Sequence, residues 1–176
     1  MKDINKNLES DITTAKEIVN TTIPYVNDYW GNREYHVGKV SMILDKKGEG
    51  RVTISYVDKK DPPNVVNVYI DSKQKKILNL RSLNREDKAD PGEINIYEWT
   101  VDSDLAIDIT KELFKSETNF EIDKILAQTN NNFIKSPEVW EIKLINTKDK
   151  MTYWSTIDPY SGEVIGSGGK TTKLLI

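Results

Sequence analysis

The sequence Trp140-Glu-Ile-Lys-Leu-Ile, followed by Tyr153-Trp-Ser-Thr-Ile-Asp158-Pro-Tyr-Ser-Gly-Glu-Val-Ile165, decides the fold because a weaker copy of it occurs upstream. The upstream copy reads Val52-Thr-Ile-Ser-Tyr-Val and then Val68-Tyr-Ile-Asp71-Ser-Lys-Gln-Lys-Lys-Ile-Leu78. Each copy follows a stretch whose apolar residues recur at helical spacing. The repeating unit is therefore expected to be one helix followed by several strands.

A helix is expected before each set of strands. The first is predicted from about Asp11 to Ile23, where Pro24 would break or kink it. Near its start, Thr14 and Glu17 have the spacing of a capping box. The second helix is predicted to begin after Asp102 and to carry the apolar residues Leu105, Ala106, Ile109 and Leu113.

Strand signals follow both helices, as runs in which every second residue is apolar. This alternation predicts antiparallel sheets with one buried face, which the helix of the same unit would cover. The segment from Phe120 to Ala127 fits no period well, and it is placed as a strand by analogy with Val37 to Leu44. The alternating residues are Val40, Met42, Leu44, Val52, Ile54, Tyr56, Val66, Val68 and Ile70, then Trp140, Ile142, Leu144, Met151, Tyr153 and Ile157.

The turn Asp158-Pro-Tyr-Ser-Gly162 has proline where a turn needs a fixed φ and glycine where it needs a positive φ. Gly162 is therefore predicted to have φ > 0. The first copy has Lys75 at this position. Its turn is expected either to use another geometry or to hold a strained lysine.

These same residues also carry a family resemblance. A tryptophan that opens an alternating strand, a polar hairpin, and a strand that ends in Ile157-Asp158 before Ser161-Gly-Glu-Val-Ile165 resemble the signature of the PepSY family. The match extends over about Asp102 to Gly166 and is weaker over Asp11 to Leu80. The resemblance implies an α+β fold of two tandem cystatin-like units, each a helix packed on a curved antiparallel sheet. It implies no catalytic motif, because the family has none to carry over.

The boundary between the two units is expected in a polar, charged stretch that contains a proline and two turn signals. This stretch, Asn84-Arg-Glu-Asp-Lys-Ala-Asp-Pro-Gly-Glu93, lacks any apolar period. The sequence is therefore divided into residues 1–85 as a first, divergent PepSY-like unit, 86–93 as a linker, and 94–176 as the second unit.

Composition excludes several classes of function. The 176 residues have a formal net charge of −3 with both signs interspersed, so no basic stripe is available for nucleic acid. One histidine and no cysteine make a catalytic triad improbable and exclude a multi-histidine or thiolate metal site. We therefore expect no catalytic residues, no metal and no cofactor. His36, beside Tyr29, Trp30 and Tyr35, is interpreted as a structural or exposed residue.

Two motifs suggest ligand sites without meeting their requirements. The run Gly166-Ser-Gly-Gly-Lys-Thr171 resembles the end of a phosphate-binding loop, but its first glycine would fall on Val164 and too few residues remain for the required helix. It is interpreted instead as a flexible tail. The acidic residues of the linker lack the alternate spacing of a calcium-binding loop.

Two aromatic residues are predicted to form the contact surface. Trp154 shares the polar phase of its strand with Thr152 and Thr156, and Tyr69 shares a polar phase with Asn67. Aromatic side chains on a solvated sheet face are typical of binding surfaces, since they bury a large area at a small cost in entropy. The alternative is that the rest of the chain covers them. Trp140 lies in the apolar phase and is assigned to the core.

These features together predict a non-enzymatic binding or regulatory module that contacts a protein or peptide. The resemblance to the PepSY family implies peptidase inhibition or chaperoning as candidate roles. The start, Met1-Lys-Asp-Ile-Asn-Lys-Asn, lacks the apolar stretch of a secretory signal. We expect an extracytoplasmic protein of the cell envelope or a secreted one, whose export segment or membrane tether has been removed; a cytoplasmic location is the alternative. The alternative function is a small-ligand or enzymatic domain with a pocket between helix and sheet.

Overall fold

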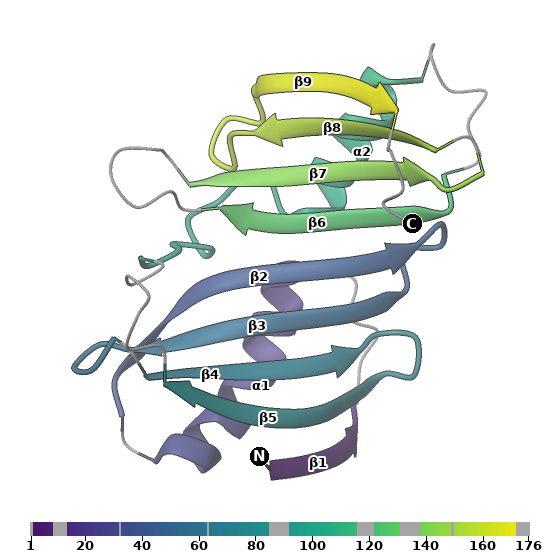
Figure 1. Cartoon of the computed structure of the whole chain (residues 1–176). Helices are drawn as coiled ribbons and strands as arrows, with labels where there is room; N and C mark the ends of the chain where they lie inside the picture. The colour runs from purple at the N-terminus through teal and green to yellow at the C-terminus, as the bar shows by residue number, and fades with distance from the viewer. Residues whose placement is uncertain are drawn as a thin grey trace.

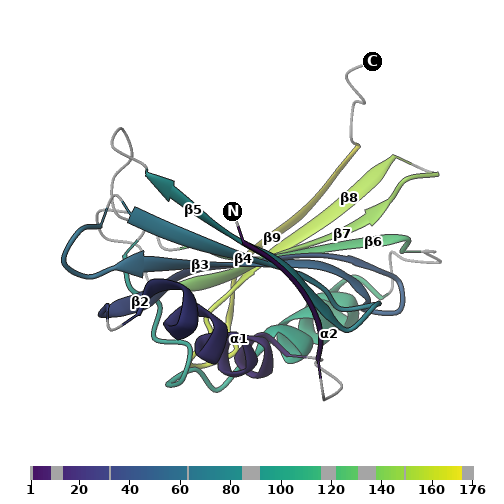
Figure 2. The ribbon, with the colours of Figure 1, turned by 90° about the horizontal axis from the view of Figure 1, so that it is seen from below.

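A computed structural model describes residues 2–8, 14–31, 33–62, 64–84, 92–115, 122–130, 138–148 and 150–171. Within these residues the chain forms two helices and one nine-stranded antiparallel sheet, in the order β1-β5-β4-β3-β2-β6-β7-β8-β9 (Figure 1). Both helices lie on the same side of the sheet (Figure 2). The elements are β1 (Lys2–Asn7), α1 (Ala15–Trp30), β2 (Tyr35–Asp45), β3 (Gly50–Asp58), β4 (Asn64–Asp71), β5 (Lys76–Asn84), α2 (Ser103–Leu113), β6 (Lys124–Asn130), β7 (Val139–Asn146), β8 (Met151–Ile157) and β9 (Val164–Thr171).

The core lies between the helices and the sheet face that they cover. The inward residues of the strands alternate as the sequence indicates, and Trp140, Ile54, Val68 and Ile142 are all fully buried. The indole of Trp140 donates a hydrogen bond to the carbonyl of Val101 at 3.0 Å, which satisfies its one polar atom. The assignment of Trp140 to the core is confirmed.

Helix α1 is longer than the sequence indicates. The predicted capping box at its start is present, with Thr14 as N-cap and Glu17 as its partner. The predicted end at Pro24 is wrong, because Pro24 lies inside a helix that continues to Trp30. An interior proline costs about 3 kcal/mol. Burial of Val26 and packing of Trp30 beyond the proline offset that cost.

Helix α2 begins where the sequence predicts, after Asp102. The Asp102 carboxylate accepts a hydrogen bond from the backbone N–H of Ser103 at 2.6 Å. The same carboxylate also accepts from the backbone N–H groups of Ala15 and Lys16 at 3.1 Å, at the start of α1. One aspartate therefore caps the N-termini of both helices and links the two halves of the chain.

The sheet is continuous across the two halves, where the sequence suggested a sheet in each half. Strand β2 of the first half pairs antiparallel with β6 of the second, from Ser41 opposite Gln128 to Asp45 opposite Lys124. The halves therefore meet along this strand pair. The predicted linker at 86–93 lies outside the described residues except for Gly92 and Glu93.

Three of the strands test the weaker sequence assignments. The strand placed by analogy at 120–127 is confirmed in part, since β6 runs from Lys124 to Asn130 and residues 116–121 lie outside the described residues. The prediction of a flexible tail is wrong, because the glycine-rich segment forms the edge strand β9, which pairs with β8. Strand β1, which pairs with β5, has no counterpart in the sequence interpretation.

Both turn positions have positive φ, 77° at Gly162 and 51° at Lys75. The prediction for Gly162 is confirmed. Of the two alternatives for Lys75, the structure shows the lysine in a left-handed conformation, which L-residues other than glycine seldom adopt.

Candidate functional site

The sheet face that the helices leave uncovered, named here the open face, is a surface available to a partner. In Figure 1 the helices lie behind the strands, so this face is turned toward the reader. Its residues are those of the phase opposite to the core, such as Thr53 on β3 and Gln128 on β6. Both residues predicted as binding residues, Trp154 and Tyr69, lie on this face.

Trp154 lies on β8 between Lys143 of β7 and Gly168 of β9. A Cβ atom built on Gly168 would lie 3.0 Å from the indole Nε1, and one built on Gly166 would lie 3.5 Å from the ring carbon Cζ3. The indole therefore lies across the backbone of the glycine-rich strand and is partly buried by it. The glycines of β9 have a packing role, since any side chain at Gly168 would displace the indole.

Tyr69 lies on β4, between Thr53 of β3 and Asn79 of β5. Its hydroxyl accepts a hydrogen bond from the side-chain amide of Asn67 at 3.4 Å, and the ring is partly exposed. The surroundings of Tyr69 are polar, and its ring provides the main aromatic area on the first half of the open face.

The structure does not bring Trp154 and Tyr69 together. They share a face, but β3, β2, β6 and β7 lie between their strands. With about 4.8 Å between neighbouring strands, the two positions are roughly 24 Å apart. An extended peptide of about seven residues would span that distance.

An apolar pair lies midway between the two aromatic residues, where β2 meets β6. Ile43 and Leu126 are directly opposite each other in the register, and Ile43 is 46% exposed. Arg51 is the neighbour of Ile43 on β3, and Lys143 is the neighbour of Leu126 on β7. We name these four residues the seam. The sequence analysis missed it, because the pairing of β2 with β6 is not encoded in any local pattern.

Charge on the open face is more basic than the composition of the chain suggests. Among the described side chains, its acidic residues are Asp45, Asp71 and Glu141, which accept hydrogen bonds from turn N–H groups or from Gln128 and remain negatively charged. The backbone N–H groups of Glu49 and Lys47 lower the pKa of Asp45. Among the described side chains, the exposed cations of this face are Lys39, Arg51, Arg81, Lys124 and Lys143, so cations outnumber carboxylates by five to three.

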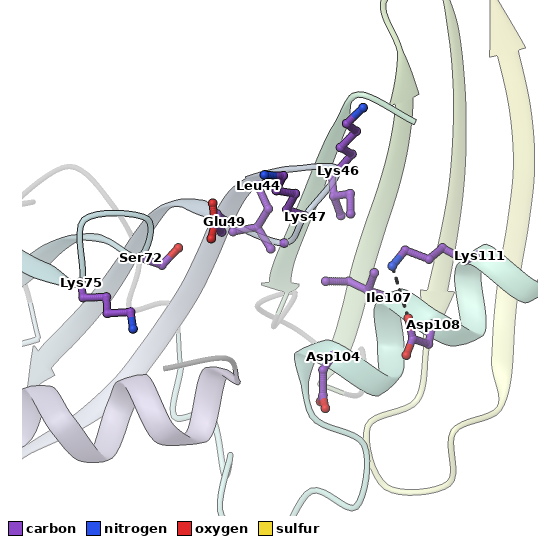
Figure 3. Close-up of a pocket in the computed structure, with 12 residues that line it drawn as sticks. Leu44, Lys46, Lys47, Glu49, Ser72, Lys75, Asp104, Ile107, Asp108 and Lys111 are labelled. Carbon is purple, nitrogen blue, oxygen red and sulfur yellow. Dashed lines mark hydrogen bonds and ion pairs between the residues drawn. The ribbon is translucent and has the colours of Figure 1, made fainter. Parts of the chain in front are cut away.

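A cavity of about 530 Å³ lies on the helix side, between the turns of the first half and α2 (Figure 3). The turns contribute Lys46, Lys47 and Lys75, and α2 contributes Asp104 and Asp108. Its apolar lining consists of Leu44, Ile107 and Ile125. The cavity thus lies where α2, the sheet and the turns of the first half meet, and part of it is between helix and sheet, where the alternative function placed a pocket.

The described residues contain no group of three or more histidine, cysteine, aspartate or glutamate side chains placed to hold a metal. His36 is buried at the start of β2, opposite Val57. The acidic linker residues 86–91 lie outside the described residues. Among the parts of the chain that the structure describes, no helix is long and apolar enough to cross a membrane.

Comparison with known proteins supports the sequence resemblance in the second half. Residues 100–167 match the model of PepSY, the peptidase propeptide and YPEB domain. The second half resembles PepSY domains. The matched region contains α2, β6, β7, β8 and the first part of β9, and it closely follows the limits expected from the sequence.

A solved structure shares the fold of nearly the whole chain. It is a protein from Clostridium difficile 630 described as a "putative lipoprotein", 18% identical, with a TM-score of 0.62. The alignment covers 94% of this chain and 100% of that one. The fold of the chain therefore recurs in a second protein. No curated protein matches the chain.

Proposed function

We propose that this protein is a non-enzymatic, extracytoplasmic module that binds a protein or peptide partner through the open face. The observation that carries the proposal is Trp154, which β9 supports from one side and which remains partly exposed beside Lys143. Aromatic residues held in this way are typical of interaction hot spots. Tyr69 forms a second contact on the other half of the same face.

The comparisons support the class and the location. The description of the matching PepSY model names a peptidase propeptide. We therefore favour inhibition or chaperoning of a peptidase as the regulatory role. The structural neighbour is described as a lipoprotein, which favours the cell envelope and a membrane tether upstream of the sequence in hand. Neither match reported above is to an enzyme family, so neither supports a catalytic function.

We also propose that residues 1–85 and 94–176 are two cystatin-like units that have fused their sheets, with 86–93 as the connection. The order of elements supports this division, because each half has one helix followed by four consecutive antiparallel strands. Asp102 then joins the two units on the helix side.

The cavity between the turns and α2 favours a second candidate, a receptor for a small charged ligand. Lysines from two turns and carboxylates on α2 line the same cavity, together with apolar side chains. A ligand there would carry both signs of charge. The open face remains our first choice because the charged groups of the cavity also interact with each other, as Lys111 does with Asp108 at 3.3 Å.

A pull-down from native envelope extract tests the main proposal. The Trp154→Ala, Tyr69→Ala double variant is expected to fold and to lose the partner recovered by the unmodified protein. The control is Leu105→Ala with Leu113→Ala, which removes exposed apolar area from α2 and is expected to retain the partner. Retention by the double variant would refute the open face, and turnover of a substrate by the purified chain would refute the class.

A further inference from the structure

We propose that the seam of the open face binds an acidic, extended polypeptide segment whose apolar side chain lies on Ile43 and Leu126. This inference rests on the proposed function and specifies the chemistry of the partner. It concerns the four residues Ile43, Leu126, Arg51 and Lys143, which the sequence analysis did not identify.

The seam is a row that runs across the strands. Arg51, Ile43, Leu126 and Lys143 are successive neighbours on β3, β2, β6 and β7. Three strand spacings of about 4.8 Å place the two cations about 14 Å apart, with the apolar pair between them. In an extended chain, residues four apart are also separated by about 14 Å and lie on one side. A segment with the pattern acid-x-apolar-x-acid therefore fits the row.

The fold itself does not require an apolar residue at Ile43. Its neighbours in the outward phase of β2 are Ser41 and Asp45. The Ile43 side chain is 46% exposed and is not part of the core. An exposed β-branched residue paired with Leu126 across the strands makes a small apolar patch. Patches of this kind, bordered by charge, are features of contact surfaces.

Charge selects an acidic partner. The described side chains of the open face include five exposed cations and three carboxylates, and two of the cations, Arg51 and Lys143, lie on either side of the patch. Asp71, one of the carboxylates, is the neighbour of Arg51 on β4. The chain as a whole has a net charge of −3, so its basic residues are concentrated locally against an acidic background. A carboxylate at each end of the bound segment would complement the two cations.

Shape favours a polypeptide over a membrane surface. Figure 2 shows the strands fanned out by a strong twist of the sheet. A planar bilayer would touch such a face along a narrow band and leave the rest of it in water. An extended segment can follow the row of the seam along its whole length, with Trp154 as the next residue after Lys143.

The test uses three fluorescently labelled peptides of equal length and the full chain. The first peptide repeats the pattern Glu-Ser-Leu-Ser-Glu, the second has lysine in place of glutamate, and the third has serine in place of leucine. Fluorescence anisotropy measures binding of each. Vesicles of phosphatidylglycerol and phosphatidylcholine, assayed by co-sedimentation, form a separate arm. The first peptide is expected to bind at least about tenfold more tightly than either of the others, and the vesicles are expected not to bind.

Charge reversal provides the decisive variants. Arg51→Glu with Lys143→Glu should weaken binding of the first peptide by about tenfold or more, and Ile43→Ser should weaken it to a similar degree. Lys60→Glu with Lys115→Glu makes the same change in charge at exposed positions away from the open face and should leave binding unchanged. Circular dichroism of every variant verifies that the fold is retained.

Several outcomes overturn the inference: no binding of the first peptide, equal binding of the lysine peptide, no effect of the seam variants, or binding of vesicles alone. Its failure is distinguishable from that of the proposed function. If the partner recovered from extract is lost by the Trp154, Tyr69 variant but kept by the seam variants, the open face stands and the acidic chemistry is wrong. If both sets keep the partner, the open face itself is wrong.

Discussion

Lys75 and Gly162 occupy the same turn position in the two halves, and both have a left-handed backbone conformation. Each lies between two antiparallel strands, β4 and β5 or β8 and β9, at φ values of 51° and 77°. The left-handed conformation costs an L-residue about 1 kcal/mol or more. The first half therefore tolerates a strain that the second half avoids by using glycine.

Substitution at these two positions should have unequal costs. Gly162→Val is expected to lower the free energy of unfolding by about 1 to 3 kcal/mol, because of the positive φ and because a Cβ there would lie 3.3 Å from Val101 Cγ2. Lys75→Gly should change it by less than about 1 kcal/mol, since relief of strain offsets the greater entropy of the unfolded glycine. Urea denaturation measures both. Equal costs of the two substitutions would contradict the strain assigned to a side chain at this turn position.

Asp58 makes stability depend on pH in the acid range. Burial would raise the pKa of its carboxyl, but the Arg33 guanidinium at 2.7 Å and the backbone N–H groups of Lys60 and Asp61 outweigh burial and lower it. A carboxyl with a lowered folded pKa stabilises the fold above its unfolded pKa of about 4, and this contribution is lost as the pH falls through the folded value.

Asp58→Asn should therefore flatten the acid limb of the stability curve. The free energy of unfolding, measured by urea denaturation between about pH 2 and pH 7, should fall less steeply below about pH 4 in the variant than in the unmodified protein. Glu34→Gln serves as the control, because its ion pair with Lys60 is long, at 3.9 Å, and exposed. An unchanged slope in Asp58→Asn would contradict the role assigned to the Arg33 pair.

At the scale of elements, the two helices depend on one carboxylate. Asp102 accepts from N–H groups of both α1 and α2, so it stabilises two helix N-termini at once, and each of them favours a negative charge. Thr14, by comparison, caps α1 alone.

Removal of this shared cap should cost more than removal of an ordinary one. Asp102→Ala is expected to lower the free energy of unfolding by about 2 to 3 kcal/mol, and Thr14→Ala by about 1 kcal/mol. Thermal or denaturant melts of the two variants provide the comparison. If Asp102→Ala costs no more than Thr14→Ala, the contact between the helices contributes nothing to stability.

Elements governed by local chemistry could be predicted, and those governed by distant contacts could not. The capping residues Thr14 and Asp102 and the alternation around Trp140 follow from short-range patterns. Pro24 was misjudged because the residues that carry α1 past it gain their stability from the core. The glycine-rich segment was misjudged as a tail because its glycines pack against the indole of Trp154, which lies on another strand.

For the molecule as a whole, the sequence predicted the phase of Trp154 and Tyr69 but not the surface between them. That surface exists because β2 pairs with β6, and the residues of that pair are far apart in the chain. The exposed phase of Ile43 was visible in the sequence. Its neighbour Leu126 and the cations on either side could be assigned only from the register.

The continuous sheet predicts that the two halves unfold together. Exposure of the β2 edge would break the pairs from Ser41–Gln128 to Asp45–Lys124 and the contacts of Asp102 with α1. Differential scanning calorimetry should show one transition whose calorimetric and van't Hoff enthalpies agree. Two resolved transitions would indicate that the halves behave as independent domains.

The pairing of β2 with β6 also relates the two halves by an approximate twofold rotation. Val40 faces Ile54 just as Ala127 faces Ile142, so Ser41 and Gln128 hold corresponding places, and they are paired with each other. This is the geometry of an isologous dimer within a single chain.

On the open face, however, this symmetry is lost. Trp154 precedes Asp158 by four residues, and the residue four before Asp71 is Asn67; Tyr69 corresponds in the same way to Thr156. A surface with two equal sites would take two copies of a partner. This one presents a single tryptophan and a single tyrosine, so isothermal titration calorimetry should give a stoichiometry of one partner per chain.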